Sequence, residues 1–232
     1  MTSSLLPSPP SDESDPVLEG VFGTFTITRL DRREVLGYRL SLLAVAVAQL
    51  ALLLQWRLIG PERLWPWLVL MAVSLGLALR WIHIYLLPLH RALQLFWLLG
   101  CLGGGVLALR VGPARMLPAL ADQPLWILAV GPFFAALCGI GFKEFFCFRR
   151  PEAIGVTLLL PVALLGRLVG LLDPAATLRL LGLAGLLLLV LGLRKLPMPA
   201  AADVGDKSVF DHLRQHRTAG QRAAATTAGE AP

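Results

Sequence analysis

Long apolar blocks, each close to the length of a membrane-spanning helix, constrain this sequence more than any other feature. A helix needs about 20 mostly apolar residues to cross the hydrocarbon core of a bilayer. The chain has 232 residues, and six blocks approach that requirement, at residues 38–57, 64–87, 92–109, 124–142, 153–172 and 175–193. The sequence therefore predicts an all-α, polytopic transmembrane bundle of six spans. The alternative is four or five spans, with the weaker blocks lying in the membrane interface.

The composition supports a membrane protein and excludes two other classes. Charged residues make up 16% of the chain and hydrophobic residues 56%, whereas a soluble domain is about 25% charged. Such a chain is neither an ordinary water-soluble enzyme nor a disordered regulator. We expect the lipid bilayer to be its surroundings.

The basic residues lie between the apolar blocks, where they act as topology signals. With both termini in the cytoplasm, 15 of the 21 Lys and Arg residues fall on the cytoplasmic side and 6 on the other. This bias follows the positive-inside rule. The net charge of +6 is therefore explained without a nucleic-acid partner, and we predict none.

The segments outside the spans differ in character. Residues 1–18 are rich in Ser, Pro and acidic residues and are predicted to be a disordered tail, as are residues 218–232. In the cytoplasmic pre-membrane segment, 19–37, alternation around Phe25 and Ile27 predicts a short strand. Asp31 is the expected N-cap of the first helix. The membrane domain covers 38–195. A cytoplasmic tail, 196–217, should hold a short amphipathic helix.

The densest cluster of polar chemistry is GIGFKEFFCFRRPE, residues 139–152. One interpretation is a basic cytoplasmic docking face, with Glu144 paired to Arg80 or Arg91. The other is an interfacial helix end with snorkelling cations. We hypothesise that this stretch and the tail helix form one surface that recruits a membrane or cytoplasmic protein. The candidate docking residues are Lys143, Glu144, Cys147, Arg149, Arg150, Lys207, Phe210 and Leu213.

The same stretch carries a family resemblance. Together with WIHIYLLPLHRALQLFW (81–97) and VGDKSVFDHL (204–213), it resembles a family of uncharacterised cyanobacterial integral membrane proteins. The resemblance covers roughly residues 20–215. It implies a plasma or thylakoid membrane of a cyanobacterium and implies no reaction.

Two small-residue stripes indicate close helix packing. Gly100 and Gly104 begin one in the third span, and Gly131, Ala135 and Gly139 form the other in the fourth. We expect them to pack the third span against the fourth. A homodimer through Gly100 and Gly104 is the rival interpretation.

Catalytic and cofactor motifs are weak. His83 and His90 are expected on one face of one helix, too far apart to share a metal, so we predict no haem, no other cofactor and no metal site. The buried polar set, which includes Gln49 and Gln94, offers a substrate little to hold. We predict no enzymatic activity. The favoured function is a non-catalytic scaffold or assembly protein, followed by a small-solute transporter or channel and then by a pigment or haem carrier.

Overall fold

The computed structural model describes residues 17–60, 62–84, 86–209 and 212. The chain divides into two units. The membrane unit comprises Leu36–Met198, and the terminal unit comprises the chain up to Val35 together with the chain from Pro199 onward. We describe each unit by itself.

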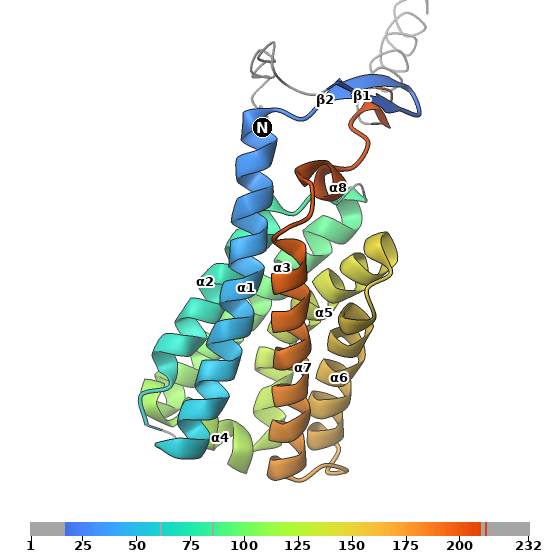
Figure 1. Ribbon diagram of the computed structural model, residues 1–232. Coiled ribbons are helices and arrows are strands. Elements are labelled where there is room, and N and C mark those ends of the chain that lie inside the picture. The colour runs from blue at the N-terminus through green and yellow to red at the C-terminus, as the bar shows by residue number, and fades with distance from the viewer. Residues whose placement is uncertain (1–16, 61, 85, 210–211, 213–232) are drawn as a thin grey trace, which may run out of the picture. The chain divides into compact units, whose positions relative to one another are not determined.

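Helices build almost all of the membrane unit (Figure 1). The long ones are α1 (Arg29–Leu58), α2 (Trp65–Trp81), α3 (Leu87–Val111), α5 (Ile127–Phe148), α6 (Pro151–Leu168) and α7 (Pro174–Lys195). Short helices η1 (Pro113–Arg115), α4 (Met116–Asp122) and η2 (Pro124–Trp126) connect α3 to α5. Helix α5 packs between α3 and α6, and α6 packs against α7. Helix α7 approaches α1 where Gly185 and Gly192 face Leu50 and Leu43.

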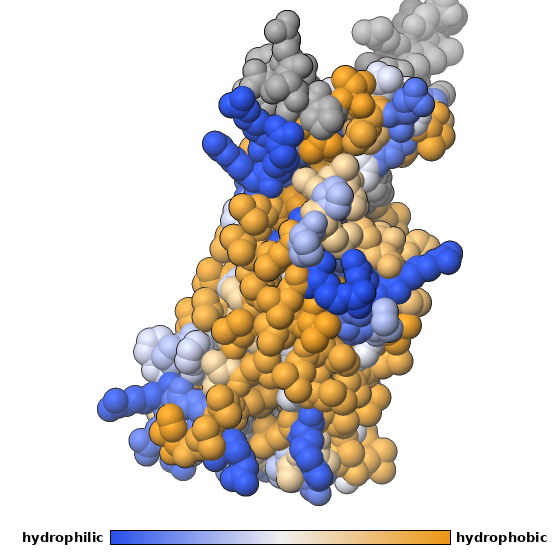
Figure 2. Space-filling view, in the orientation of Figure 1, coloured by the Kyte–Doolittle hydropathy of each residue, from blue (hydrophilic) through white to orange (hydrophobic). Residues whose placement is uncertain are grey.

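The apolar outer surface of this unit matches a lipid environment. Leu54, Leu102, Leu128 and Leu158 are each more than half exposed, while Leu42, Leu75 and Leu188 are buried in the core. Figure 2 shows hydrophobic residues along the visible flank of the helices and hydrophilic residues near their ends. Five helices, α1, α3, α5 with η2, α6 and α7, are long and apolar enough to cross a membrane. Helix α2 is also apolar but has only 17 residues.

The end of helix α2 differs from the prediction. Helix α2 ends at Trp81, whereas we expected the second span to reach residue 87. Pro88 explains this, because in a continuous helix its ring would clash with the carbonyl of residue 84. Pro88 instead lies in the first turn of α3, after the extended residue Leu86. His83 therefore lies in the connection while His90 lies in α3, so the prediction that they share one helix is wrong. Helix α5 runs to Phe148, so residues 143–148 continue the helix of the predicted fourth span, which was expected to end at residue 142.

Helix α3 packs against α5, as predicted for the third and fourth spans, but of the glycines in the two predicted stripes only Gly100 and Gly139 make this contact. A Cβ atom on Gly100 would collide with the backbone of Phe133, and one on Gly103 with the backbone of Ala129. A Cβ atom on Gly139 would likewise collide with Leu93. Gly104 takes no part in this contact, because the nearest atom to its Cβ position is the Met116 methyl carbon at 4.0 Å. Homodimerisation through Gly100 and Gly104 stays a prediction.

The terminal unit begins with a small antiparallel hairpin. Strands β1 (Val17–Gly20) and β2 (Gly23–Thr26) pair with Gly20 opposite Gly23, and Gly23 has a φ of 136°, which favours glycine. The strand predicted around Phe25 is confirmed, and β1 is its unpredicted partner. The tail meets this hairpin: the Val21 amide donates to Asp206 over 2.7 Å, and the Phe22 amide donates to Ser208 over 3.1 Å.

The start of α1 in the terminal unit is capped by Thr28. The Thr28 hydroxyl accepts from the Asp31 amide over 3.2 Å, and Asp31 accepts from the Thr28 amide over 2.8 Å. This is a reciprocal capping arrangement one turn earlier than expected, so the prediction of Asp31 as N-cap is wrong. Helix α8 (Ala200–Val204) was not predicted. Of the predicted tail helix, the structure describes Ser208, Val209 and His212 in helical conformation.

Candidate functional site

A fully buried carboxylate, Glu144, is the centre of the membrane unit's most polar cluster. Its side chain is 0% exposed. Its Oε1 atom accepts from the Tyr38 hydroxyl over 2.6 Å and from Lys143 Nζ over 3.1 Å. Its Oε2 atom accepts from Lys195 Nζ over 2.6 Å. Lys195 is 1% exposed and Lys143 8%, so the carboxylate and both ammonium groups lie away from solvent.

Two aromatic rings enclose the lysine ammonium groups. Lys195 Nζ lies 4.2 Å from the centroid of the Phe148 ring and 5.4 Å from that of Tyr38. Lys143 Nζ lies 5.2 Å and 5.4 Å from the same two centroids. Ring faces attract cations at such distances, and the attraction strengthens where water is excluded. The rings therefore replace part of the hydration that the lysines give up on burial.

The sequence places these groups by continuing the buried stripe of each helix to its end. In α1 the stripe runs from Leu42 back one turn to Tyr38, and in α5 it runs from Ile140 on to Glu144. In α7 it runs from Leu191 on to Lys195. Residues three and four apart share one face of a helix. The last residue of each stripe thus turns inward, and the three helices meet around one carboxylate.

Further polar contacts tie the same helix ends together. Arg194 Nη1 donates to both carboxylate oxygens of Glu152, over 3.0 and 3.1 Å, which joins α7 to α6. Arg39 Nη1 donates to the Met198 carbonyl over 2.6 Å, which joins α1 to the chain after α7. Glu152 is 5% exposed and Arg194 51%, so this ion pair lies at the edge of the unit.

The turn from α5 to α6 presents the exposed part of the predicted site. Arg149 closes α5 in a left-handed conformation with a φ of 50°, and its amide donates to the Phe145 carbonyl over 2.7 Å. Arg150 is extended, as a residue before proline prefers, and Pro151 opens α6. Cys147 and Arg149 are exposed. Arg150 is half-buried and donates to the Met198 sulfur over 3.2 Å.

The structure separates the predicted docking residues into groups. Lys143 and Glu144 face inward, whereas Cys147 and Arg149 face outward. Lys207 belongs to the terminal unit, where its Nζ donates to Asp31 over 2.8 Å. The remaining two candidates, Phe210 and Leu213, lie outside the described residues. The ion-pair partners of Glu144 are Lys143 and Lys195, and not Arg80 or Arg91 as expected.

Sequence reasoning missed Tyr38, Phe148 and Lys195. It assigned Lys195 to the exposed cytoplasmic charges and Tyr38 to the start of the first span. A usable signal was present, because Lys195 continues the helical spacing of the apolar residues Leu188 and Leu191. A charged residue in register with a buried stripe requires a partner of opposite charge at the same depth, and Glu144 is one.

Helical architecture, an apolar outer surface and interior ion pairs near the helix ends define an integral membrane protein of the polytopic α-helical class. A family model described as uncharacterized integral membrane protein (DUF2301) matches residues 77–212, more than half of the chain, so the protein belongs to that family. The match covers Glu144, Lys195 and the α5–α6 turn, while Tyr38 lies before it. No curated protein and no solved structure matches the chain.

Proposed function

We propose that this protein is a non-catalytic membrane scaffold that presents a basic docking surface at the α5–α6 turn. The observation that carries this is the contrast between Glu144 and its neighbours along the chain. Glu144 in α5 is fixed by hydrogen bonds from α1 and α7, whereas Cys147 and Arg149, nearer the end of α5, are exposed. A rigid support with exposed cationic and thiol groups suits the recruitment of a partner better than it suits chemistry.

We also propose six spans with both termini in the cytoplasm. Helix α2 supports the sixth span, because its inner face, including Met71, Leu75 and Leu79, is buried in the same core as the longer helices. Its 17 residues correspond to about 25 Å, slightly short of the hydrocarbon thickness. Trp65 and Trp81 stand at its two ends, where the interface favours aromatic residues. The bias of 15 basic residues against 6 supports the orientation.

The proposed setting is a cyanobacterial plasma or thylakoid membrane, and it rests on the sequence resemblance alone. The family description names neither an organism nor a type of membrane. Separation of native plasma and thylakoid membranes followed by detection of the protein in each fraction would test it.

Transport of a small polar solute is less well supported. Neither of the two cavities described in the membrane unit includes Gln49 or Gln94 in its lining. Gln49 instead donates through Nε2 to the Leu181 carbonyl over 2.8 Å and thereby joins α1 to α7. A haem or pigment carrier is also less well supported, because the two candidate histidines lie in different segments. His90 Nε2 in α3 lies 2.6 Å from the Leu79 carbonyl oxygen, and His83 lies in the α2–α3 connection.

Charge reversal at the α5–α6 turn tests the docking surface. The variant carries Arg149→Glu and Arg150→Glu and is purified from the native membrane beside the wild type. We expect it to insert and fold but to lose the proteins that co-purify with the wild type. The matched control is Arg110→Glu with Arg179→Glu, an equal charge change at exposed positions near the other ends of the helices. If both variants retain every partner, the docking proposal is wrong.

A further inference from the structure

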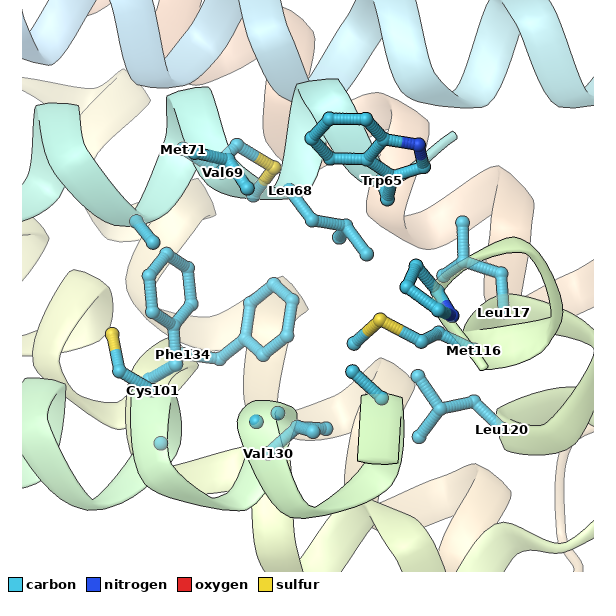
Figure 3. A pocket seen from close by; sticks show the side chains of 17 residues that line it. Trp65, Leu68, Val69, Met71, Cys101, Met116, Leu117, Leu120, Val130 and Phe134 are labelled. Atoms are coloured by element: carbon cyan, nitrogen blue, oxygen red, sulfur yellow. The ribbon is translucent and has the colours of Figure 1, made fainter. Parts of the chain in front are cut away.

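The membrane unit contains an apolar cavity of about 340 Å³ (Figure 3). Helices α2, α3 and α5 form its walls, and η1 with α4 borders it at the ends of those helices. Its volume falls at the lower end of the range of about 300–1,000 Å³ that is usual for small-molecule sites. In Figure 3 the side chains of Leu68, Met116 and Phe134 surround the open space.

The chemistry of the lining excludes a polar occupant. Among the side chains that line the cavity, only the Trp65 indole and the Cys101 thiol carry an N–H or S–H group, and the rest are aliphatic, aromatic, thioether or glycine. A polar solute would give up its hydrogen bonds to water and gain almost none in return. An occupant that fills this space must therefore be hydrocarbon.

Two glycines of α3 keep the space open. An added Cβ on Gly104 would find its nearest atom at 4.0 Å, and one on Gly105 would meet nothing within 4 Å. Gly100 and Gly103 on the same helix, by contrast, are in close contact with α5. Glycine in a helix interior is unfavourable compared with alanine. Helix contact explains Gly100 and Gly103 but leaves Gly104 and Gly105 without a packing role.

The position of the cavity indicates how a hydrocarbon reaches it. Val69, which lines it, is 51% exposed on the flank of α2, and Gly105 is exposed on α3. The cavity thus opens on the surface that faces lipid, and Pro113 and Met116 place its other border at the helix ends. A hydrocarbon chain could enter the cavity from the bilayer while a polar group attached to that hydrocarbon remains at the membrane surface.

From these observations we propose that the cavity binds one acyl chain of a lipid. The site is separate from the docking surface at Arg149 and does not depend on it. The acyl chain could belong to a phospholipid or to a free fatty acid, because the hydrocarbon that the lining recognises is the same in both.

Photocrosslinking with two probes tests the proposal. The purified protein is incubated with a long-chain fatty acid that carries a diazirine near the end of its chain, or with a phospholipid bearing the same chain, and labelled peptides are mapped. We expect wild-type protein to be labelled on residues of α4 and α5 such as Met116 and Phe134. The probe that labels these residues at the lower concentration identifies the source of the chain.

Gly104→Leu is the decisive variant, because Gly104 lines the cavity and an added Cβ there would meet no atom closer than 4.0 Å. It should lose the labelling, and the fatty acid should no longer raise its melting temperature. Val106→Phe is the matched control, since it adds the same number of carbon atoms on the exposed side of α3. It should be labelled like the wild type.

Two outcomes would overturn the proposal. One is labelling spread evenly over the exposed helix faces in all variants, which indicates surrounding bilayer lipid only. The other is full labelling of Met116 and Phe134 in Gly104→Leu. Should Gly104→Leu fail to fold, Val130→Phe fills the same cavity from α5 and is judged by the same two criteria.

Discussion

At the scale of single residues, burial and partnership decide what Glu144 does. A carboxylate with no exposed surface is stable only when its oxygens are hydrogen-bonded and its charge is balanced. Tyr38, Lys143 and Lys195 meet both needs within 3.1 Å. The cluster therefore holds α1, α5 and α7 together through hydrogen bonds and ion pairs.

Removal of the Glu144 carboxylate should destabilise the protein strongly. In Glu144→Ala two buried ammonium groups lose their counter-charge, and we expect a loss of about 3–5 kcal/mol in the free energy of unfolding. Unfolding by a graded series of denaturing detergent would measure it. Glu152→Ala is the control: its partner Arg194 is half exposed and can turn to water, so the loss should be about 1 kcal/mol. Equal losses in the two variants would contradict the role assigned to Glu144.

How far the site could be predicted follows from the same residues. The sequence identified Glu144 as a carboxylate that needs a partner, but it did not identify the cations that pair with it. Distance along the chain gives no guide, because Lys195 lies 51 residues away from it and Tyr38 lies 106. Only the packing of α1 and α7 against α5 brings them together, and that packing depends on many weak contacts rather than on one motif.

At the scale of elements, apolar length predicted where helices form and local stereochemistry decided where they end. Every long helix of the structure overlaps a predicted span. The error arose at Pro88, which lies in the first turn of α3 and separates that helix from α2. Helix α4 was missed because its seven residues are too few for a periodic pattern.

The junction between the hairpin and the tail should respond to acid. Hydrogen bonds from Ser208 and from the Val21 amide hold the pKa of Asp206 below its ordinary value of 3.8. A lowered pKa means that the junction is fully stabilised above pH 3.8 and loses that stabilisation as the pH falls through the lowered value. The NMR shift of the Val21 amide should follow this titration. In Asp206→Asn it should stay constant over the same range, and a transition above pH 3.8 in the wild type would contradict the assignment.

At the scale of the whole molecule, orientation in the membrane controls which surfaces a partner can reach. Helices α5 and α6 are joined by only Arg149 and Arg150, so their connection is confined to one side of the membrane. The basic-residue bias predicts that this side is the cytoplasm. Cys147 is exposed near the end of α5, so its reaction with a thiol reagent shows on which side of the membrane the α5–α6 turn lies.

Thiol labelling should therefore distinguish the two orientations. A membrane-impermeant reagent is expected to label the protein in inside-out vesicles and not in intact cells. Cys147→Ser is the control and should abolish the signal, because Cys101 and Cys138 are partly buried within the helices. Labelling of Cys147 in intact cells would reverse the proposed orientation and place the α5–α6 turn outside the cytoplasm.

The pairing of Glu144 with Lys195 also has a consequence for biosynthesis. The ribosome makes Glu144 51 residues before Lys195, the last residue of α7. Until α7 is inserted, the carboxylate has only Tyr38 and Lys143 as its partners in the cluster. A chain truncated before α7 thus lacks Lys195, the cation with the shortest contact to Glu144, and with it the ion pair that joins α5 to α7, so we expect unfinished chains to be less stable than finished ones.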